Sequence, residues 1–588
     1  MKRVQPMMAL AVVLALSALV SGWDRDIPVS RGRRLVELSG QSRPAFTQVP
    51  AADIGAAIKA ELSSALISTT NPLTRREQVE LKTLYEEGGH SPLWVDAGGR
   101  PQSCAIDALT LLRSAEDDGL DPADYSLDRL DRLVATVRPG SPTVVRDLAA
   151  VDVALSALML RYLHDVHSGR VDPSALGLRL SVPTDHHDFA ALLRSAIAGH
   201  RLVETVADLR PQFAQYRALR TMLARYRLFA PAAVSAQERL PPLASVVHPG
   251  ERYAGIDALY RLLATVGDLP GGTAAPAAST AYEGALVEGV RRFQVRHGLS
   301  ADGVLGKSTQ AALRIPLARR VRQIELALER LRWLPHLGDE RLVAINSPMF
   351  RLWTWDTIPP NGEPLFGMNV IVGRALRTQT PVFVEQLREV VFRPYWNVPP
   401  SIARHEIVPQ IERNPGYLTR ENMEIVSGPG DDAQAVPETA ENVSLLRQGR
   451  LRVRQRPGPK NALGLVKFVF PNAENVYMHG TPAQELFSRS RRDFSHGCVR
   501  VEDPVALAEW ALKERPEWTR ARILAAMSGT QTIHVSLLQP IRVILFYTTA
   551  AVMPDDGTIH FAEDIYAHDA ALDRALARGS RVVRPARL

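Results

Sequence analysis

One cysteine and one histidine have the types and spacing of a nucleophile and its base. Cys498 lies in the segment Ser495-His496-Gly497-Cys498-Val499-Arg500, and His479 lies nineteen residues earlier, in Tyr477-Met478-His479-Gly480-Thr481. A thiol becomes a strong nucleophile when a nearby imidazole or a positive field favours the thiolate. His479 ends a separate β-like run, so it can approach the thiol from outside the nucleophile's own turn. We predict Cys498 as the nucleophile and His479 as the general base.

The residues around Cys498 suit acyl transfer. Gly497 leaves the backbone open where the Gly497 and Cys498 amides could face a developing oxyanion, and we place Gly497 with the catalytic residues. Arg500 could bind a substrate carboxylate or add positive field. Aromatic residues in strands more often lie in a core than in a cleft. We nevertheless predict that Tyr477 and Trp396 line the cleft. The predicted substrate-binding residues are Arg500, Ser495, His496, Gly480, Tyr477 and Trp396, of which Ser495 and His496 are expected to shape the nucleophile's turn.

The cysteines and histidines could also have structural or metal-binding roles. Cys498, His479 and His496 also form a ligand set that catalytic zinc accepts, since such sites need three protein ligands. The run Asp185-His186-His187-Asp188 resembles a metal cluster, but its loop context favours a solvated turn. Cys104 falls on an apolar helical pattern and is expected to be a buried small hydrophobe. We expect no metal and no cofactor.

Composition bounds the class of protein. The chain has 588 residues, 46% hydrophobic and 23% charged, which is ordinary globular composition. A single core of that length is implausible, so several domains are expected. The 70 Lys and Arg residues and 63 Asp and Glu residues give a small net charge of +7. The sequence has no long basic run, so we expect no nucleic-acid partner. Two cysteines 394 positions apart exclude a disulfide framework.

The amino terminus has the pattern of an export signal. Lys2 and Arg3 precede an apolar stretch from Met7 to Val20, which small and polar residues follow. The stretch is shorter than the roughly 20 residues that a spanning helix needs. We predict residues 1–22 as a signal peptide and the mature protein as exported, in the periplasm or cell envelope. An uncleaved N-terminal anchor, which would bring the protein to the membrane, is left open.

The periodicity of apolar residues divides the rest of the chain. A helical pattern covers the first half, and beyond Arg341 short β-like runs recur with a period near two. Long segments without such runs inside a compact domain are usually functional lids or disordered. The expected fold class is α+β and multidomain: a helical scaffold (44–240), a small helical module (245–315), a linker helix (316–338), a mostly β domain (340–550) with a lid (399–464), and a C-terminal tail (551–588).

Several motifs resemble one known family. His479-Gly480-Thr481 followed by Ser495-His496-Gly497-Cys498-Val499-Arg500 resembles the active-site signature of the L,D-transpeptidases, which are cysteine enzymes of bacterial peptidoglycan with a YkuD-type, β-rich catalytic domain. Phe293-Gln294, His297-Gly298-Leu299 and Asp302-Gly303 resemble the small three-helix peptidoglycan-binding module. Trp396-Asn397-Val398-Pro399 and Asn461-Ala462-Leu463-Gly464 are similar to the large subfamily, which carries a scaffold, a binding module and a lid.

The resemblance implies a reaction and its partners. The donor and the acceptor would be peptidoglycan tetrapeptide stems, joined in 3→3 cross-links through a Cys498 thioester after release of D-Ala, and carbapenems would acylate the same sulfur. It also implies that a backbone carbonyl orients His479, and that other cell-wall synthesis enzymes are possible partners. Water as acceptor would give an L,D-carboxypeptidase, and a protein lysine would give an anchoring enzyme. A non-catalytic peptidoglycan-binding scaffold and a zinc-dependent wall hydrolase also stay open.

Overall fold

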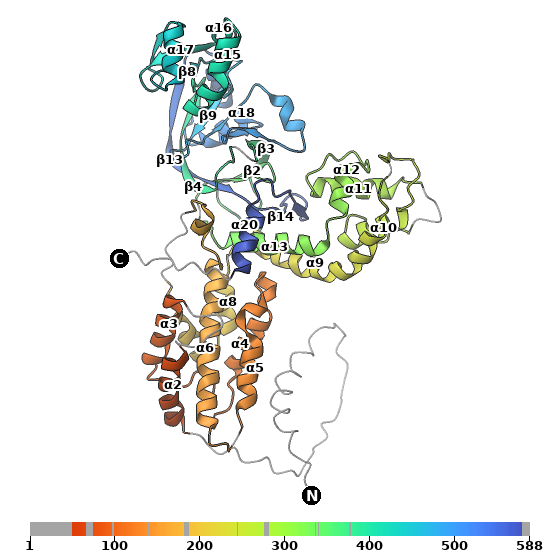
Figure 1. Ribbon diagram of the computed structural model, residues 1–588, viewed down its shortest axis with the longest axis vertical. Helices are drawn as coiled ribbons and strands as arrows, with labels where there is room; N and C mark the ends of the chain where they lie inside the picture. The colour runs from red at the N-terminus through yellow and green to blue at the C-terminus, as the bar shows by residue number, and fades with distance from the viewer. Residues whose placement is uncertain are drawn as a thin grey trace.

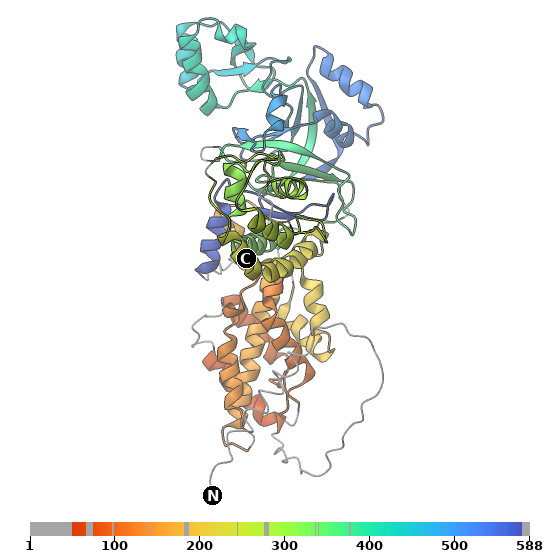
Figure 2. The same cartoon turned by 90° about the vertical axis from the view of Figure 1, so that its right-hand side faces the viewer.

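The computed structural model places a helical region at one end of an elongated molecule and a β-rich region toward the other (Figures 1 and 2). The binding-module helices lie to one side, beside the middle of the long axis (Figure 1). Helices and strands are both abundant, so the α+β, multidomain expectation is confirmed. The structure describes residues 50–65, 74–96, 99–138, 140–180, 187–243, 245–275, 281–334, 337–338, 340–375 and 378–578.

A bundle of helices around the long central α6 forms the first region. Helix α6 packs against α2, α3, α5 and α7 because its apolar residues recur every three or four positions. Cys104 lies in this core with no exposed surface, and burial raises the pKa of its thiol, as expected for a structural cysteine. The helices are α2 (Ala51–Ala65), α3 (Arg75–Glu86), α4 (Ser103–Arg113), α5 (Leu127–Thr136), α6 (Val144–Ser168), α7 (Phe189–Ala198) and α8 (Leu202–Leu209).

The last helix assigned to the scaffold from the sequence packs elsewhere. Within the predicted scaffold segment (44–240), the helix that begins at Leu202 stops before Arg210-Pro211, because the residue before a proline disfavours helical backbone angles. The following helix, α9 (Ala214–Glu238), shares a buried core with the binding module instead of with α6. Its main neighbours are α10 (Ile256–Val266) and α13 (Leu317–Leu331), and the module is completed by α11 (Ala285–Arg296) and α12 (Lys307–Leu313).

The β-rich region is a sheet that closes on itself. Its strand order is β11-β3-β12-β10-β9-β4-β13-β1-β2, and an additional pairing of β2 with β3 completes the ring. Closure removes the exposed edges that an open sheet would present. The strands are β1 (Leu342–Asn346), β2 (Arg351–Trp355), β3 (Phe366–Gly373), β4 (Phe383–Phe392), β9 (Val466–Val469), β10 (Met478–His479), β11 (Asp493–Ser495), β12 (Val499–Val501) and β13 (Ile533–Phe546).

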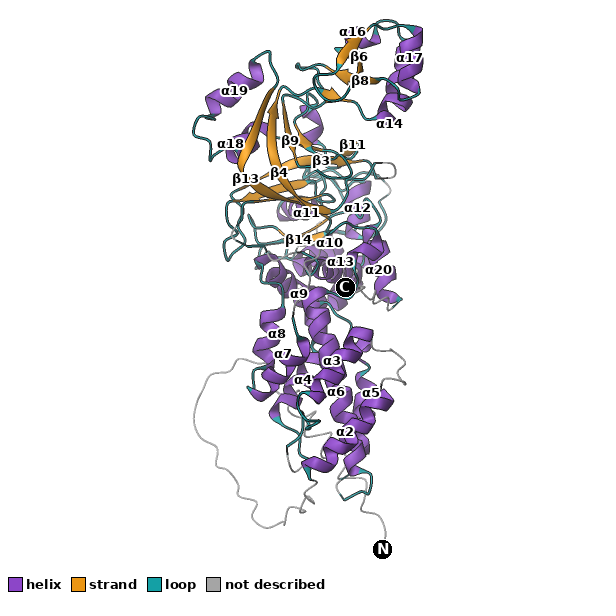
Figure 3. Cartoon of the chain, turned by 90° about the vertical axis from the view of Figure 1, so that its left-hand side faces the viewer, coloured by secondary structure: helices purple, strands orange, loops and turns teal. Residues whose placement is uncertain are grey.

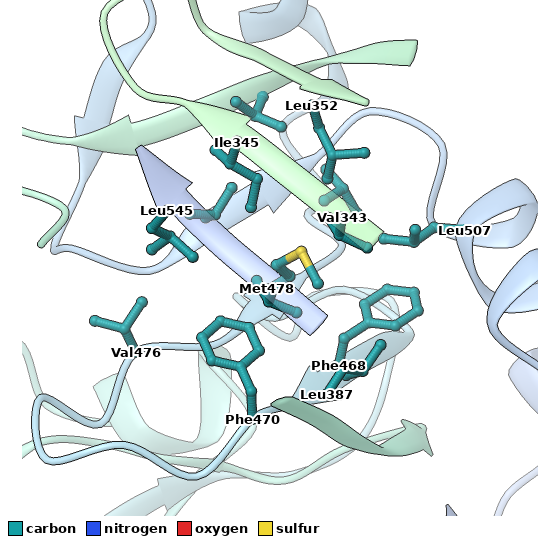
Figure 4. Close-up of a cluster of buried hydrophobic side chains, with 14 of the residues drawn as sticks. Val343, Ile345, Leu352, Leu387, Phe468, Phe470, Val476, Met478, Leu507 and Leu545 are labelled. Carbon is teal, nitrogen blue, oxygen red and sulfur yellow. The ribbon is translucent and has the colours of Figure 1, made fainter. Parts of the chain in front are cut away.

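Alternation along these strands sends one set of side chains into a shared core. Val343, Phe468 and Met478 are fully buried together and lie close to one another in Figure 4. Since successive side chains in a strand point to opposite faces, the neighbours of these residues in sequence lie on the outer face of the sheet. Two helices, α18 (Pro504–Ala511) and α19 (Arg520–Ser528), contribute further apolar residues to the core.

The segment predicted as a lid folds as a small unit of its own. It carries a four-stranded sheet in the order β5-β8-β6-β7 and a separate apolar core that includes Ile402, Ile425 and Val453. In Figure 3 it lies at the end of the molecule far from the scaffold. Its elements are β5 (Trp396–Asn397), α14 (Pro400–Ile402), a π-helical turn (Ala403–Ile407), α15 (Val408–Arg413), α16 (Tyr417–Arg420), β6 (Met423–Ser427), β7 (Gln434–Val436), α17 (Ala440–Arg447) and β8 (Arg452–Gln455).

The expectation of a C-terminal tail from residue 551 is wrong for residues up to 578. They form β14 (Ala550–Val552), β15 (Ile559–Phe561) and α20 (His568–Ala577). Ile559 and Phe561 are buried against the binding module, and Asp569 forms a buried ion pair with Arg330 of α13 at 2.5 Å. Such short strands separated by polar turns give a weak periodic signal, which explains the missed fold.

Candidate active site

The predicted nucleophile and base share the outer face of the closed sheet. Strand β10 runs parallel to β12, with Met478 opposite Val499 and His479 opposite Arg500, and antiparallel to β9, with His479 opposite Lys467. Met478 and Val499 point into the core. His479, Arg500 and Lys467 therefore share the outer face, and Cys498, two residues before Arg500, joins them there.

The imidazole of His479 is held as a neutral base. Its Nδ1 lies 2.5 Å from the carbonyl oxygen of Gly480, which can only accept, so Nδ1 carries the proton and Nε2 is left unprotonated. The ring is buried, and burial, followed by the charge of Arg500 and, more weakly, that of Lys467, lowers the pKa of His479 to about 3. The expected orienting carbonyl is thus that of Gly480.

The Cys498 thiol is half-buried and contacts residues of the β10 segment. Sγ lies 3.9 Å from the carbonyl oxygen of Asn475. Burial raises the pKa of Cys498, whereas hydrogen bonds from the backbone and side chain of Tyr477 and the charges of Lys467 and Arg500 oppose that rise. The hydrogen bonds of the described residues include none between Cys498 and His479, which are diagonal neighbours on adjacent strands.

Tyr477 connects the thiol to the insertion. Its hydroxyl is hydrogen bonded to Cys498 and to Trp396 of β5, and burial, followed by the Cys498 charge, raises the pKa of Tyr477 well above its usual value. The ammonium of Lys467 lies 4.1 Å from the centre of the tyrosine ring, a cation–π contact. Tyr477 and Trp396, selected from the sequence as cleft residues, therefore lie against the candidate nucleophile, and both are half-buried.

A serine fixes the turn before the nucleophile. Ser495 Oγ donates to the carbonyl oxygen of Cys498 at 2.6 Å and accepts from the Gly497 amide at 3.2 Å. The Gly497 N–H is therefore engaged with Ser495, which contradicts its expected orientation toward an oxyanion. Gly497 has φ +114 and its carbonyl accepts from Thr380 Oγ1 at 2.8 Å, so it is needed for the shape of the turn.

His496 faces the insertion and not the thiol. Its Nε2 lies 2.8 Å from Glu406 Oε1, in the π-helical turn. Arg500 is half-buried, its Nε is buried without a hydrogen-bond partner, and it has no carboxylate partner among the ion pairs of the described residues. Burial and the charge of Arg374 lower the pKa of Arg500. An uncompensated guanidinium next to Cys498 is suited to an anionic ligand.

Close backbone contact explains the Asn461-Ala462-Leu463-Gly464 motif. Gly464 has φ +64, and a Cβ there would lie 2.6 Å from the Thr481 amide nitrogen and 2.7 Å from the Gly480 carbonyl carbon. Only glycine fits, because the segment packs directly on the turn that supplies the His479 partner. The Gly480 amide donates to the carbonyl of Val466 at 2.9 Å. Gly480 thus positions His479 through its own carbonyl and is buried.

Two residues of the site were missed in the sequence. Lys467 stands between Val466 and Phe468, and strand alternation would have placed it on the outer face with His479 once the pairing of β9 with β10 was known. Glu406 lies ninety residues before His496, and no local pattern links them. In the part of the chain that is described, no group of three or more His, Cys, Asp or Glu residues could hold a metal ion. Asp185 and His186 lie outside the described residues.

Comparisons with known proteins identify the domains of the chain. Three family models match the chain: "Scaffold domain" over residues 79–223, "Putative peptidoglycan binding domain" over 252–313, and "L,D-transpeptidase catalytic domain" over 340–532. His479 and Cys498 fall in the third. The chain therefore carries an L,D-transpeptidase catalytic domain together with a scaffold domain and a peptidoglycan-binding domain, and the resemblance found in the motifs is confirmed.

One curated relative is a protein of Haemophilus influenzae named "Putative L,D-transpeptidase". It is 31% identical over 253 residues, which are 43% of this chain and 49% of the relative. The chain thus spans about half the length of the curated relative that it matches.

Proposed function

We propose that the protein is a peptidoglycan L,D-transpeptidase that acts through Cys498. The observation that carries the proposal is the outer face of the catalytic domain. There a half-buried thiol lies on the same face as a neutral imidazole and two cations that form no ion pair among the described residues. A neutral His479 can accept a proton, and Arg500 and Lys467 favour the thiolate that forms.

The chemistry begins with transfer of the thiol proton to His479 Nε2. A rotation about the Cα–Cβ bond of Cys498 would turn Sγ away from the Asn475 carbonyl and toward the imidazole, which lies diagonally across the two adjacent segments. The thiolate then attacks the carbonyl that joins the third residue of a tetrapeptide stem to D-Ala. The D-Ala amine leaves with the proton from His479, and Cys498 keeps the acyl group as a thioester.

A second stem completes the cycle. Its side-chain amine attacks the thioester, gives a proton to His479, and forms the 3→3 peptide bond while the thiol is restored. With the Gly497 amide bonded to Ser495, the Cys498 amide and the Tyr477 hydroxyl remain as donors beside the sulfur, and we assign the oxyanion to them. Contacts of Trp396 and Glu406 with the site let the insertion limit access of water, which favours an amine acceptor.

The domain types also suggest where the protein acts. Peptidoglycan lies outside the cytoplasm, so we propose that the chain is exported, with residues 1–22 as its signal. Those residues lie outside the described part of the structure. None of the helices in the described ranges combines the length and the hydropathy that a membrane span requires.

The test is incubation with purified disaccharide-tetrapeptide, analysed by mass spectrometry. A cross-linked dimer that has lost one D-Ala supports transpeptidation, whereas D-Ala loss without a dimer identifies a carboxypeptidase. The Cys498→Ala variant should give neither product. We also expect a carbapenem to add its mass to the wild-type protein and not to this variant. Full activity after alanine replaces Cys498, or loss of activity with a chelator, would overturn the assignment.

A further inference from the structure

A cavity of about 350 Å³ opens between three segments that are distant in the sequence. Met222 and Arg225 of α9 form one wall, Arg292 and Val295 of α11 a second, and the turn that contains Thr558, between β14 and β15, a third. The volume is within the roughly 300–1,000 Å³ of small-molecule sites. The C-terminal segment thus completes a hollow on the binding module.

Most charges around the cavity are already neutralised. Arg296 is buried and forms two hydrogen bonds with Asp268, at 2.7 and 2.5 Å. Arg291 forms an ion pair with Glu288 at 2.5 Å. Asp556 accepts hydrogen bonds from Thr558 and contacts His560. These residues are therefore not available to hold a ligand by charge alone.

Two guanidinium groups, those of Arg225 and Arg292, form no ion pair with a carboxylate among the described residues. Arg292 donates from Nε to the carbonyl oxygen of Asp268 at 2.7 Å, and Arg225 lies over the Phe229 ring at 5.2 Å. Neither has an acidic partner among the ion pairs of the described residues, although the buried arginines 161, 296, 330, 332 and 454 each have one. Both lie at the surface, where a ligand can reach them.

The lining fits a short anionic peptide. Arginine pairs with carboxylates in a planar, two-point geometry that orients as well as attracts them. Met222, Val266 and Val295 supply apolar surface beside these cations, and the side chain of Val295 is 49% exposed. A peptide stem of peptidoglycan combines free carboxylates with short aliphatic side chains, which is the chemistry that this lining would recognise.

We propose that Arg225 and Arg292 bind the carboxylates of a peptidoglycan stem in this cavity, apart from the catalytic face. The site rests on the proposed function, because that function brings the chain to peptidoglycan. The site is formed jointly by α9, α11 and the β14–β15 turn. The binding module without that turn would therefore have an incomplete site.

The test is binding of a soluble disaccharide-tetrapeptide to full-length protein treated with N-ethylmaleimide. The reagent blocks the catalytic cleft at Cys498 and spares Cys104, which has no exposed surface. We expect the Arg225→Gln/Arg292→Gln variant to bind at least ten-fold more weakly than wild type by calorimetry. The Arg225→Lys/Arg292→Lys variant should retain part of the affinity. The same muropeptide with amidated carboxylates should bind wild type as weakly as the glutamine variant binds the free acid.

A matched control removes the same charge elsewhere. Arg252 and Arg319 are exposed and do not line the cavity, so the Arg252→Gln/Arg319→Gln variant should bind within two-fold of wild type. Equal binding by the Arg225/Arg292 variant, equal binding of the amidated muropeptide, or an equal loss in the control variant would overturn the proposal. Failure of wild type to release D-Ala would count against the proposed enzyme activity alone, since binding is measured with Cys498 blocked.

Discussion

At the scale of single residues, the protonation state of the site follows from burial and neighbouring charge. His479 is neutral because it is buried and Arg500 lies opposite it, and a carbonyl of its own turn fixes the tautomer. Lys467 lies on the same face and favours the Cys498 thiolate. A base that is neutral at every physiological pH can accept the thiol proton without first losing one of its own.

Removing the Lys467 charge tests the field around Cys498. In the Lys467→Met variant we expect the pKa of the Cys498 thiol to rise, because a cation that favours the thiolate is lost. The rate of carbapenem acylation should fall roughly five-fold if about 1 kcal/mol of stabilisation disappears. The pH dependence of Cys498 alkylation measures the shift. Lys467→Arg should restore it, and Lys513→Met, which removes a cation paired with Asp356, should leave it unchanged. An unaltered alkylation profile in Lys467→Met would refute this role.

The depressed pKa of His479 predicts the pH dependence of stability. Its pKa is about 3 when folded and ordinarily 6.5, so between these values the unfolded chain binds a proton that the native protein does not. The free energy of unfolding should therefore be fully retained above about pH 6.5 and should decrease as the pH falls toward 3. Denaturant unfolding from pH 4 to 7 measures this slope. The slope should be shallower in His479→Asn, and an equal slope in the two proteins would contradict the assignment.

At the scale of elements, the orientation of His479 depends on close packing between the turn at Gly464 and the turn at Gly480. The Gly464 turn packs on the backbone of Gly480 and Thr481, and the Gly480 carbonyl in turn fixes His479. The insertion contributes from the other side through Trp396 and Glu406, which contact Tyr477 and His496. The geometry of the site therefore depends on three segments that contain neither the nucleophile nor the base.

We expect Gly464→Ala to lower the free energy of unfolding by more than the cost of its positive φ alone. A left-handed non-glycine residue costs about 1–2 kcal/mol, and here the new Cβ would also press on the Thr481 backbone. Gly298→Ala is the matched control, since Gly298 has the same φ of +64 and no atom lies within 4 Å of the position that its Cβ would take. Unfolding free energy and acylation rate should both fall further in Gly464→Ala. Equal losses in the two variants would show that the contact has no effect.

At the scale of the whole molecule, a buried carboxylate joins the scaffold to the rest of the chain. Asp118 has no exposed surface and contacts Arg210 at 2.9 Å and Arg220 at 2.7 Å, while its backbone carbonyl accepts from Arg332 of α13. Burial alone would raise the pKa of Asp118, but hydrogen bonds and charges of these arginines hold it below the usual value. The network connects α9 and α13 to the helical bundle.

Asp118→Asn should loosen that junction. Removing one partner of a buried charge network typically costs about 3–5 kcal/mol, because the remaining charges stay buried. We expect a lower free energy of unfolding and faster proteolysis at the start of α9, with the acylation rate of Cys498 largely preserved. Asp117→Asn, at the exposed neighbouring position, should change neither quantity. Proteolysis at the wild-type rate in Asp118→Asn would argue against a junction role.

Local patterns in the sequence were sufficient for several features. The change of apolar period from helical to alternating predicted a multidomain α+β chain, and the types and spacing of His479 and Cys498 were enough to predict a nucleophile and a base, which stays a prediction. Such signals depend only on residue type and short-range geometry. The burial of Cys104 followed from the same kind of pattern.

Only the tertiary structure decided which distant groups meet. Pairing of β9 with β10 brought Lys467 beside His479, the insertion brought Glu406 to His496, and packing on the binding module folded the segment after Ala550. It also turned the Gly497 amide toward Ser495. Strand register, close packing and burial depend on contacts between residues far apart in the chain, and no local pattern of residue types determines them.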